Sequence, residues 1–319
     1  MELQKSMIRY DWTIENLSDL YNQPFSDLIF QAQSIHRQYF PGNKIQKATL
    51  LSIKTGSCSE DCAYCAQSAH NKSKIQEHKL LSVEEVKQAA LNALDKGSTR
   101  LCMGAAWRQV KDNSDFERVL EMVRVVSGLG LEVCCTLGML TLEQAKLLKE
   151  AGCCTYNHNL DTSPEYYGNI VSTHTYNERL ETLKNVREAG ITVCCGGILG
   201  MGESLNDRLS LLQQLATQNP HPDSVPINML VQIEGIRLKK QPPLDPFDFV
   251  RIVAVARITM PTSMVRLSAG RVYMSDETQA LCFIAGANSI HTGSKLLTTP
   301  NVGEDNDDVL VRKLGLTYV

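Results

Sequence analysis

From about residue 48 onward, short apolar segments alternate with longer segments in which apolar residues recur at helical spacing. The short segments have the length of buried strands and end near polar or glycine-rich residues. Strands are therefore predicted at 49–53, 99–104, 131–136, 153–158, 191–197, 225–231, 264–268 and 288–291. The helices that follow them are predicted at 83–96, 115–127, 142–151, 175–189, 204–218, 246–258, 276–286 and 306–314.

Local signals delimit three of these helices. A Ser or Thr stands three positions before a Glu or Gln at each start, in the pairs Ser82 and Glu85, Thr141 and Gln144, and Thr175 and Glu178. A glycine stands at each expected end, namely Gly97, Gly152 and Gly190. Repeats of strand and helix in a chain of this length predict an α/β fold, a closed (β/α)8 barrel of the TIM type.

An open doubly wound sheet is the alternative fold, and the alternation of side chains within the strands argues against it. Helices cover both faces of an open sheet, which favours continuously apolar strands. In the run LEVCC, Val133 points to one side while Glu132 and Cys134 point to the other. In a barrel, the apolar residues such as Val133 would point toward the helices. The residues of opposite phase, such as Glu132 and Cys134, would line a polar lumen.

Four residues on different strands fall in this inward phase: Cys102, Cys134, Cys194 and Arg266. Each alone has an ordinary explanation, because unpaired cysteine is often buried and an inward arginine can pair with a carboxylate such as Glu132. Three thiols on one polar lumen would also make a site for a soft metal or a cluster. The remaining cysteines of the barrel are predicted to be packing residues: Cys135, Cys153, Cys154, Cys195 and Cys282.

Segments outside the repeats complete the expected architecture. Residues 26–40 have an amphipathic pattern, and we expect this helix to cover the lower mouth of the barrel. We assign residues 1–45 to an N-terminal helical extension and 46–319 to the barrel. The proline-containing stretch 236–247 is predicted to be a loop at the active-site face, and the acidic run 304–308 to be a solvated helix start that needs no partner.

Three closely spaced cysteines follow the first predicted strand, in the run CSEDCAYC: Cys58, Cys62 and Cys65. Three thiolates can hold a [4Fe–4S] cube and leave one iron free to bind a small molecule. Zinc, with His70 as a fourth ligand, is the alternative. A structural zinc site usually has a second Cys-x-x-Cys pair, and the sequence contains only one, which favours the cube.

Composition limits the location and the partners. The chain has 319 residues, 43% of them hydrophobic, and eleven cysteines. We expect a cytoplasmic protein, because the sequence shows no secretory signal, no transit peptide and no bilayer-spanning run. Its 32 basic and 35 acidic residues give a net charge of −3, which makes no electrostatic case for nucleic acid or an anionic membrane. Small molecules are the expected partners.

Several runs of the sequence resemble the biotin synthase family of radical S-adenosylmethionine (AdoMet) enzymes, from about residue 10 onward. The matching runs include TGSCSEDCAYCAQS, STRLCMGAAWR, YNHNLDTSPEYYGNI and VRLSAGR. The resemblance implies that the first three cysteines hold an AdoMet-binding [4Fe–4S] cluster. It also implies that Cys102, Cys134, Cys194 and Arg266 ligate a [2Fe–2S] cluster, although arginine is an unusual ligand because a guanidinium has no free lone pair.

The resemblance also implies contacts to the small molecules. Tyr64 is expected at the adenine of AdoMet, and Gly196 and Gly197 are expected where the backbone approaches its amino-acid end. Arg179 is a candidate for the AdoMet carboxylate, with a solvated helix face as the alternative.

Three more residues are expected near the ribose and the substrate. Asn159 and Asp161 are expected to contact the ribose of AdoMet and the substrate, with turn or cap residues as the alternative. Asn228 is expected at the ureido ring of the substrate.

The implied reaction converts dethiobiotin to biotin. A 5′-deoxyadenosyl radical from AdoMet removes hydrogens from two unactivated carbons, and a sulfide of the [2Fe–2S] cluster supplies the sulfur. An electron donor such as flavodoxin or ferredoxin, iron–sulfur assembly machinery and a homodimer are expected with it. The rivals are another radical AdoMet barrel enzyme, such as methylornithine synthase or the hydrogenase-maturation relative, and a non-catalytic iron–sulfur carrier.

Overall fold

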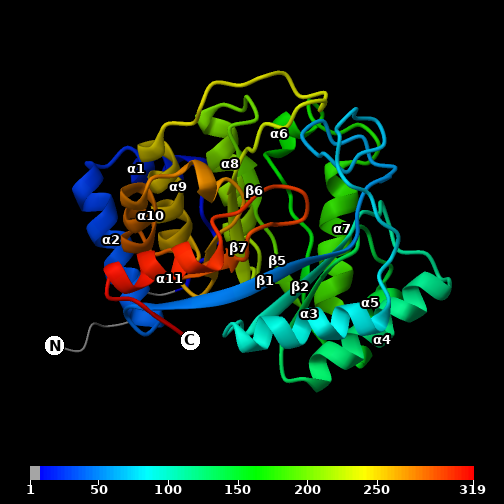
Figure 1. Ribbon diagram of the computed structural model, residues 1–319. Coiled ribbons are helices and arrows are strands. Elements are labelled where there is room, and N and C mark those ends of the chain that lie inside the picture. Colours follow the sequence, from blue (N-terminus) through cyan, green and yellow to red (C-terminus); the bar gives the residue numbers. More distant parts are fainter. Residues whose placement is uncertain (1–7) are drawn as a thin grey trace.

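The computed structural model describes residues 8–319, and its centre is a closed parallel β-barrel (Figure 1). The strands are paired in the order β10-β1-β2-β3-β4-β5-β7-β8-β9, β6 pairs with β7, and β1 also pairs with β9 to close the ring. The strands are β1 Lys44–Lys54, β2 Arg100–Ala105, β3 Glu132–Thr136, β4 Cys153–Asn157, β5 Thr192–Cys194, β6 Gly197–Leu199, β7 Ser224–Met229, β8 Met264–Leu267, β9 Ser289–Thr292 and β10 Thr317–Tyr318.

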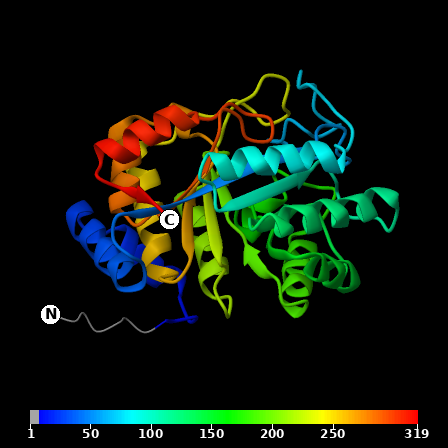
Figure 2. The same ribbon diagram turned by 60° about the horizontal axis from the view of Figure 1, so that its bottom comes forward.

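Helices surround this barrel, as expected of a (β/α)8 fold (Figure 2). They are α1 Ile14–Tyr21, α2 Phe25–Tyr39, α3 Val83–Asp95, α4 Ser114–Gly128, α5 Leu142–Ala151, α6 Pro164–Tyr167, α7 Tyr176–Glu188, α8 Leu205–Ala216, α9 Pro246–Thr259, α10 Asp276–Ile284 and α11 Glu304–Lys313, with a 3-10 turn η1 at Arg271–Tyr273. The barrel prediction is confirmed, and each predicted helix is present close to its predicted position. The predicted strand 191–197 is divided into β5 and β6, and the short elements α1, α6, η1 and β10 were not predicted.

The three predicted helix starts have the expected capping geometry. The hydroxyl oxygens of Ser82, Thr141 and Thr175 each accept a hydrogen bond from the backbone N–H three residues later, and the Glu or Gln there bonds back to the cap residue. Gly152 ends α5 at a φ of 108°, a left-handed conformation that favours glycine. Local sequence therefore fixes where these helices begin and end.

The predicted phases of the strands are confirmed by packing. Leu101, Val133 and Val193 point outward and belong to the main hydrophobic core between strands and helices. Their neighbours Cys102, Cys134 and Cys194 point inward and form a separate buried cluster. The cysteines predicted to pack belong to the main core: Cys135, Cys153, Cys195 and Cys282. Cys154 is only half-buried, and its thiol donates to the Val133 carbonyl at 3.2 Å.

The N-terminal helices lie on the outside of the helical ring. Helix α1 packs against α8 and α9, and α2 packs against α9 and α10 (Figures 1 and 2). The expectation that α2 covers the lower barrel mouth is therefore wrong, because its buried side, with Leu28, Ala32 and His36, lies against the outer helices. The first seven residues of the predicted extension 1–45 lie outside the described residues. Within residues 8–319, no helix is long and apolar enough to span a membrane.

The acidic run at the start of α11 is paired, so the prediction of a solvated segment is wrong. Asp307 is fully buried and forms an ion pair with Arg271, which also donates to Gln279 at 3.1 Å. Glu304 pairs with Lys96 at 2.6 Å, and Asp308 pairs with Lys47 at 2.9 Å. These pairs could not be predicted from the sequence, because their cations belong to distant segments that only the closed barrel brings next to α11.

The buried pair of Asp307 and Arg271 predicts a large effect on stability. Replacing Asp307 by Ala leaves the Arg271 guanidinium buried without a counter-charge, and we expect the free energy of unfolding to fall by about 3–5 kcal/mol. Glu304→Ala on the same helix removes a more exposed ion pair and should cost less than about 1 kcal/mol. Chemical denaturation of both variants measures the difference, and equal losses would contradict a structural role for the buried pair.

Candidate active site

One cavity of about 340 Å³ lies at the carboxyl ends of the barrel strands, where active sites of this fold occur. Its lining includes every residue predicted to ligate a cluster: Cys58, Cys62, Cys65, Cys102, Cys134, Cys194 and Arg266. The predicted contacts Tyr64, Asn159, Asp161, Arg179 and Asn228 line it as well. The fold thus joins the loop thiols and the lumen thiols in one space.

The cysteine loop after β1 is held by hydrogen bonds to its own backbone. The Asn71 amide donates to the carbonyl oxygens of Cys62 and Cys65 at 3.1 and 2.7 Å. The Cys58 N–H donates to Gln67 at 2.9 Å, and Cys58 O accepts from the Ala69 N–H. The sequence did not single out Asn71, because its contacts depend on how the loop folds. This loop is therefore shaped by protein contacts around its three thiols.

The electrostatics of the loop thiols fit a ligand that displaces protons. Burial raises the pKa of Cys58 and Cys62, and it raises the pKa of Cys65 to about 11. A metal or cluster binds thiolates, so its binding would release these protons. Within residues 8–319, no three Cys, His, Asp or Glu side chains converge on one metal ion. The exposed His70 ring contacts the Ser59 carbonyl at 3.2 Å and does not line the cavity.

The lumen thiols form a hydrogen-bonded row with Cys134 in the middle. The bonds with Cys134 lower the pKa of Cys102 and bring that of Cys194 to about 7, and the same bonds raise the pKa of Cys134. The charge of Arg266 also favours the two outer thiolates. Asn157 donates to the Cys194 sulfur at 3.3 Å. The row is therefore prepared to carry negative charge at its two ends.

Arg266 is fully buried without a carboxylate partner. Its Nε donates to Ser289 at 2.8 Å and one Nη donates to Gln46 at 2.9 Å, both neutral groups. Its other Nη is buried with no partner among the described residues. Glu132, the carboxylate considered for it, pairs with Arg100 at 2.8 Å instead. A buried cation with an open donor beside three thiols fits an anionic sulfur-rich cluster.

His291 is a cavity residue that our sequence interpretation left unassigned. Its Nδ1 lies 2.9 Å from the Ser268 hydroxyl, and its Nε2 is buried with no partner among the described residues. It contacts Cys102, and burial lowers its pKa. The alternation along β9 could have predicted its inward position, because the neighbouring Ile290 points outward into the core. The cavity-lining segment 296–299 after β9 carries no comparable sequence signal.

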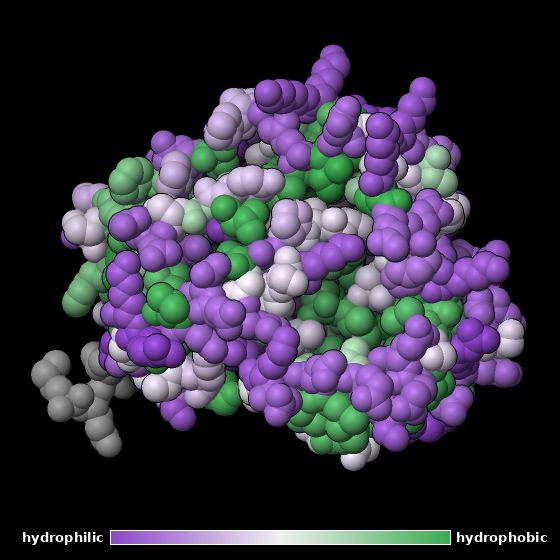
Figure 3. All heavy atoms as spheres, viewed as in Figure 1, coloured by the Kyte–Doolittle hydropathy of each residue, from purple (hydrophilic) through white to green (hydrophobic). Residues whose placement is uncertain are grey.

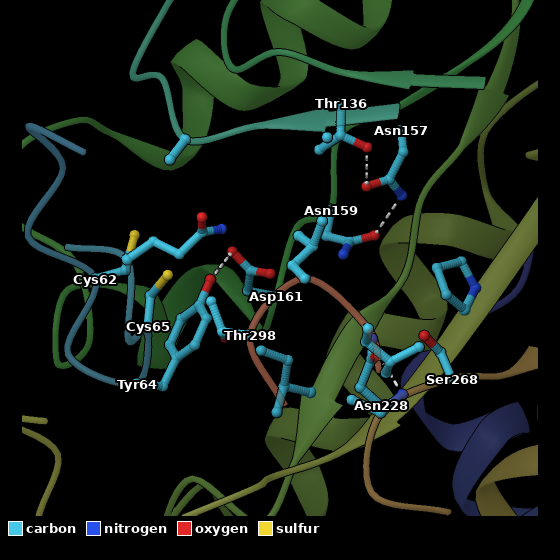
Figure 4. Close-up of a pocket in the computed structure, with 18 of the residues that line it drawn as sticks. Cys62, Tyr64, Cys65, Thr136, Asn157, Asn159, Asp161, Asn228, Ser268 and Thr298 are labelled. Carbon is cyan, nitrogen blue, oxygen red and sulfur yellow. Dashed lines mark hydrogen bonds between the residues drawn. The ribbon is translucent and has the colours of Figure 1, made fainter. Parts of the chain in front are cut away.

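Amide and hydroxyl side chains line the cavity wall beyond the loop thiols Cys62 and Cys65 (Figure 4). The Thr136 hydroxyl donates to Asn157 at 3.2 Å, and Asn157 donates to Asn159 at 3.0 Å. The Tyr64 hydroxyl donates to Asp161 at 2.7 Å (Figure 4). Thr136 and Asn157 end β3 and β4, Asn159 and Asp161 follow β4, and Tyr64 comes from the cysteine loop. Asn159 and Asp161 therefore turn polar atoms toward the space where the sequence predicted AdoMet and substrate.

Arg179 of α7 is buried, so the alternative of a solvated helix face is wrong. It forms an ion pair with Asp161 at 3.0 Å and donates to the Asn159 carbonyl at 2.7 Å. Its Nε donates to the Tyr167 hydroxyl at 2.5 Å. It reaches the cavity because the residues on the inner side of α7 face the end of β4.

A buried network connects the cysteine loop to this arginine. The Tyr167 hydroxyl lies 2.7 Å from His174 Nε2, and His174 Nδ1 lies 2.6 Å from the Glu60 carboxylate. Burial raises the pKa of Glu60, but hydrogen bonds from His174 and Thr173 outweigh it and lower the pKa. No sequence signal indicated these residues, because Glu60 and His174 are far apart in the chain.

Gly196 and Gly197 are needed for packing. A Cβ on Gly196 would clash with the Pro226 carbonyl, and one on Gly197 would clash with Leu211 and the Asp161 backbone. Neither glycine lines the cavity, so their contact with AdoMet stays a prediction. Asn228 lines the cavity, and its amide donates to Gly197 O at 2.9 Å and accepts from the Ala269 N–H at 3.1 Å.

Two family models match this chain. The Radical SAM superfamily matches residues 52–215, and the Biotin and Thiamin Synthesis associated domain matches residues 226–317. The FeFe-hydrogenase maturase of Carboxydothermus hydrogenoformans has a TM-score of 0.83 at 18% identity, covering 96% of this chain and 76% of that one. Methylornithine synthase has a TM-score of 0.79 at 20% identity, covering 97% and 95%. These structures show the fold, and the Radical SAM family model defines a radical AdoMet barrel enzyme.

Sequence relatives define the family more narrowly. A biotin synthase of Methylibium petroleiphilum is 60% identical over 96% of this chain and 92% of its own length. Biotin synthases of Thioalkalivibrio sulfidiphilus and Vibrio cholerae are 60% and 56% identical, covering 98% and 97% of this chain and 91% and 88% of theirs. The chain belongs to the biotin synthase family. It is an enzyme that inserts sulfur and uses AdoMet and an iron–sulfur cluster.

The different surroundings of the cavity thiols predict different reactivity in cluster-free protein. With a pKa of about 7, Cys194 should reach its full alkylation rate slightly above neutral pH, because the thiolate is the reactive form. Cys58 lines the same cavity and has a raised pKa, so its rate should still be rising at pH 9. Iodoacetamide labelling followed by peptide mass spectrometry measures both rates. Parallel pH profiles for the two thiols would contradict this assignment.

Proposed function

We propose that this enzyme converts dethiobiotin to biotin with two different clusters. Cys58, Cys62 and Cys65 would hold a [4Fe–4S] cluster, and a second set would hold a [2Fe–2S] cluster: Cys102, Cys134, Cys194 and Arg266. The observation that supports this most strongly is that one cavity is lined by both sets, with the predicted AdoMet and substrate contacts beside them. The buried and incompletely paired Arg266 supports the second cluster independently.

The chemistry requires a radical, because the two C–H bonds that must break are too strong for acid–base catalysis. When bound, the [4Fe–4S] cluster supplies the electron that cleaves AdoMet to methionine and a 5′-deoxyadenosyl radical. Two hydrogens leave dethiobiotin, so two AdoMet molecules are consumed for each biotin. The [2Fe–2S] cluster is a substrate in this proposal, since its sulfide becomes the ring sulfur of biotin.

The residues that bind AdoMet are proposed from their free hydrogen-bonding capacity. Asp161 is buried and balanced by Arg179, and its carboxylate can accept hydrogen bonds from ribose hydroxyls. Tyr64 holds that carboxylate through its hydroxyl and presents its ring to the adenine. Arg179 and the backbone at Gly196 and Gly197 are proposed at the amino-acid end.

The substrate contacts follow the same reasoning. Asn159 uses its Oδ1 twice, accepting from Asn157 and from the Gly196 N–H at 3.1 Å, while its Nδ2 has no partner among the described residues. That Nδ2 can donate to dethiobiotin. Asn228 is fixed by two backbone bonds, which leaves one amide hydrogen to donate to the ureido oxygen. Holding the substrate between the clusters limits side reactions of the radical.

Further proposals rest on the family resemblance alone: a homodimer, an electron donor such as flavodoxin or ferredoxin, and cluster supply by iron–sulfur assembly machinery. The proposed division into an extension over 1–45 and a catalytic unit over 46–319 rests on where the strand and helix repeats begin in the sequence.

The function is tested by an anaerobic reaction of the cluster-reconstituted enzyme with AdoMet, dithionite and dethiobiotin. Mass spectrometry should detect biotin together with about two 5′-deoxyadenosines per biotin. Deoxyadenosine without biotin would refute the substrate and keep the radical chemistry. Neither product from protein with verified clusters would favour the non-catalytic carrier.

Neighbouring thiols of opposite phase provide a matched test of the second cluster. Cys194→Ala should remove the iron and visible absorbance of the [2Fe–2S] cluster, abolish biotin formation, and leave the [4Fe–4S] absorbance. Cys195→Ala removes a thiol of the outer core and should keep both clusters. Iron analysis and absorbance spectra of the two reconstituted variants distinguish them, and equal cluster loss would count against the proposed ligand set.

A further inference from the structure

Two loop segments beside the cysteine loop carry an excess of positive charge. Segments 69–79 and 232–241 together contain six Lys or Arg and two Asp or Glu residues, while the whole chain has a net charge of −3. Five lysines of these segments have exposed side chains, and we call them the lysine surface: Lys72, Lys74, Lys79, Lys239 and Lys240. Figure 3 shows long hydrophilic side chains standing out along the top of the molecule, where these loops lie in Figure 1.

Backbone contacts hold the two segments together. The Lys72 N–H donates to the Gly235 carbonyl at 2.7 Å, and the Leu238 N–H joins the second segment to the Ala63 carbonyl of the cysteine loop at 3.0 Å. Gly235 has a φ of 87°, and a Cβ there would clash with the Lys72 carbonyl. The lysine surface is therefore a fixed feature of the fold.

The lysine surface is also joined to the thiol ligands. Asn71, which holds the carbonyls of Cys62 and Cys65, accepts a hydrogen bond from the Arg237 N–H at 3.0 Å. The Arg237 guanidinium donates to the Asp61 carbonyl and lies 3.4 Å from its carboxylate. One amide side chain thus bridges the cysteine loop and the basic segment.

The five lysines do not stabilise the fold through ion pairs. In the part of the chain that the structure describes, none of them has an acidic residue within ion-pair distance, whereas Lys47, Lys96 and Lys313 each do. Like charges gathered on one surface repel each other and attract acidic molecules. The surface is thus suited to binding an acidic partner, and its charge does not serve the fold.

The position of the lysine surface beside the cysteine loop indicates which kind of acidic partner would bind there. Ser57, Ser59 and His70 of the cysteine loop are exposed, and Cys58 is half-buried, so the loop reaches the protein surface. A protein bound to the neighbouring lysines comes close to the loop thiols without entering the cavity. Nucleic acids and anionic membranes would feel the same charge, but neither has chemistry that requires a cluster nearby. An electron carrier does.

We propose that the lysine surface is the docking site of a small acidic electron-carrier protein; this rests on the proposed function. The reduced carrier loses one electron, and that electron is spent in breaking the bond between sulfur and C5′ of AdoMet. Methionine and the 5′-deoxyadenosyl radical are the products. The carrier leaves oxidised, and a second docking serves the second AdoMet.

The test compares two triple charge reversals in the holoenzyme. K72E/K239E/K240E changes the lysine surface, and K146E/K149E/K184E changes exposed lysines of α5 and α7 by the same total charge. Calorimetric titration with an acidic flavodoxin at several salt concentrations should show binding at least about tenfold weaker, with a smaller salt dependence, for the first variant only. Equal effects of both variants, or none, would overturn the proposal.

Rates of deoxyadenosine formation provide the second measurement. The lysine-surface variant should lose activity with reduced flavodoxin and retain the unsubstituted enzyme's activity with dithionite, which needs no docking site. Loss with both reductants would overturn the proposal, since it would mean damage to the active site. Retained flavodoxin binding with lost binding to anionic vesicles or heparin would also overturn it. Failure of the proposed function would give a different result. In that case the unsubstituted holoenzyme would not cleave AdoMet even with dithionite as the reductant.

Discussion

The alternation of side chains along the barrel strands is the constraint on which the rest of this molecule depends. Residues such as Leu101 and Val133 point outward and form the core with the helices. The same backbone turns Cys102 and Cys134 into the lumen, away from the layer of helices. One repeat therefore supplies both the stabilising core and a polar interior, so that chemistry in the lumen does not compete with the packing that holds the barrel together.

The lumen pairs its groups in an unusual way. Arg266 is buried among neutral partners with an open donor, and the two outer thiols beside it have lowered pKa values. Burying a cation without a counter-charge costs free energy, which a bound anionic cluster would recover. Arg100 and Arg271 are also buried, but they have carboxylate partners. Arg257 is buried without one, yet its guanidinium donates to three backbone carbonyls and to the Asn288 amide oxygen. Arg266 differs in lacking both a carboxylate and a full set of hydrogen bonds, at the place where a ligand is expected.

The mouth of the barrel depends on contacts between distant segments. Asn71 holds the cysteine loop, and Glu60 in that loop is linked through His174 and Tyr167 to Arg179. These contacts join the loop after β1 to α7, so the end of the cavity next to the cysteine loop is built as one unit. The chain belongs to the biotin synthase family, and the three thiols of this loop are proposed to hold the [4Fe–4S] cluster. The network explains how the loop is held in place without being part of a strand or helix.

The barrel, the helix ends and the phases of the lumen thiols could be predicted from the sequence alone. These features follow from spacing and capping, which are local properties of the chain. The sequence did not predict that Asp307 pairs with Arg271, that Arg179 is buried or that α2 lies against the outer helices. The partners in these cases are far apart in sequence. Periodicity shows which side of a strand or helix is buried, but it carries no information about which charge or helix it will meet there.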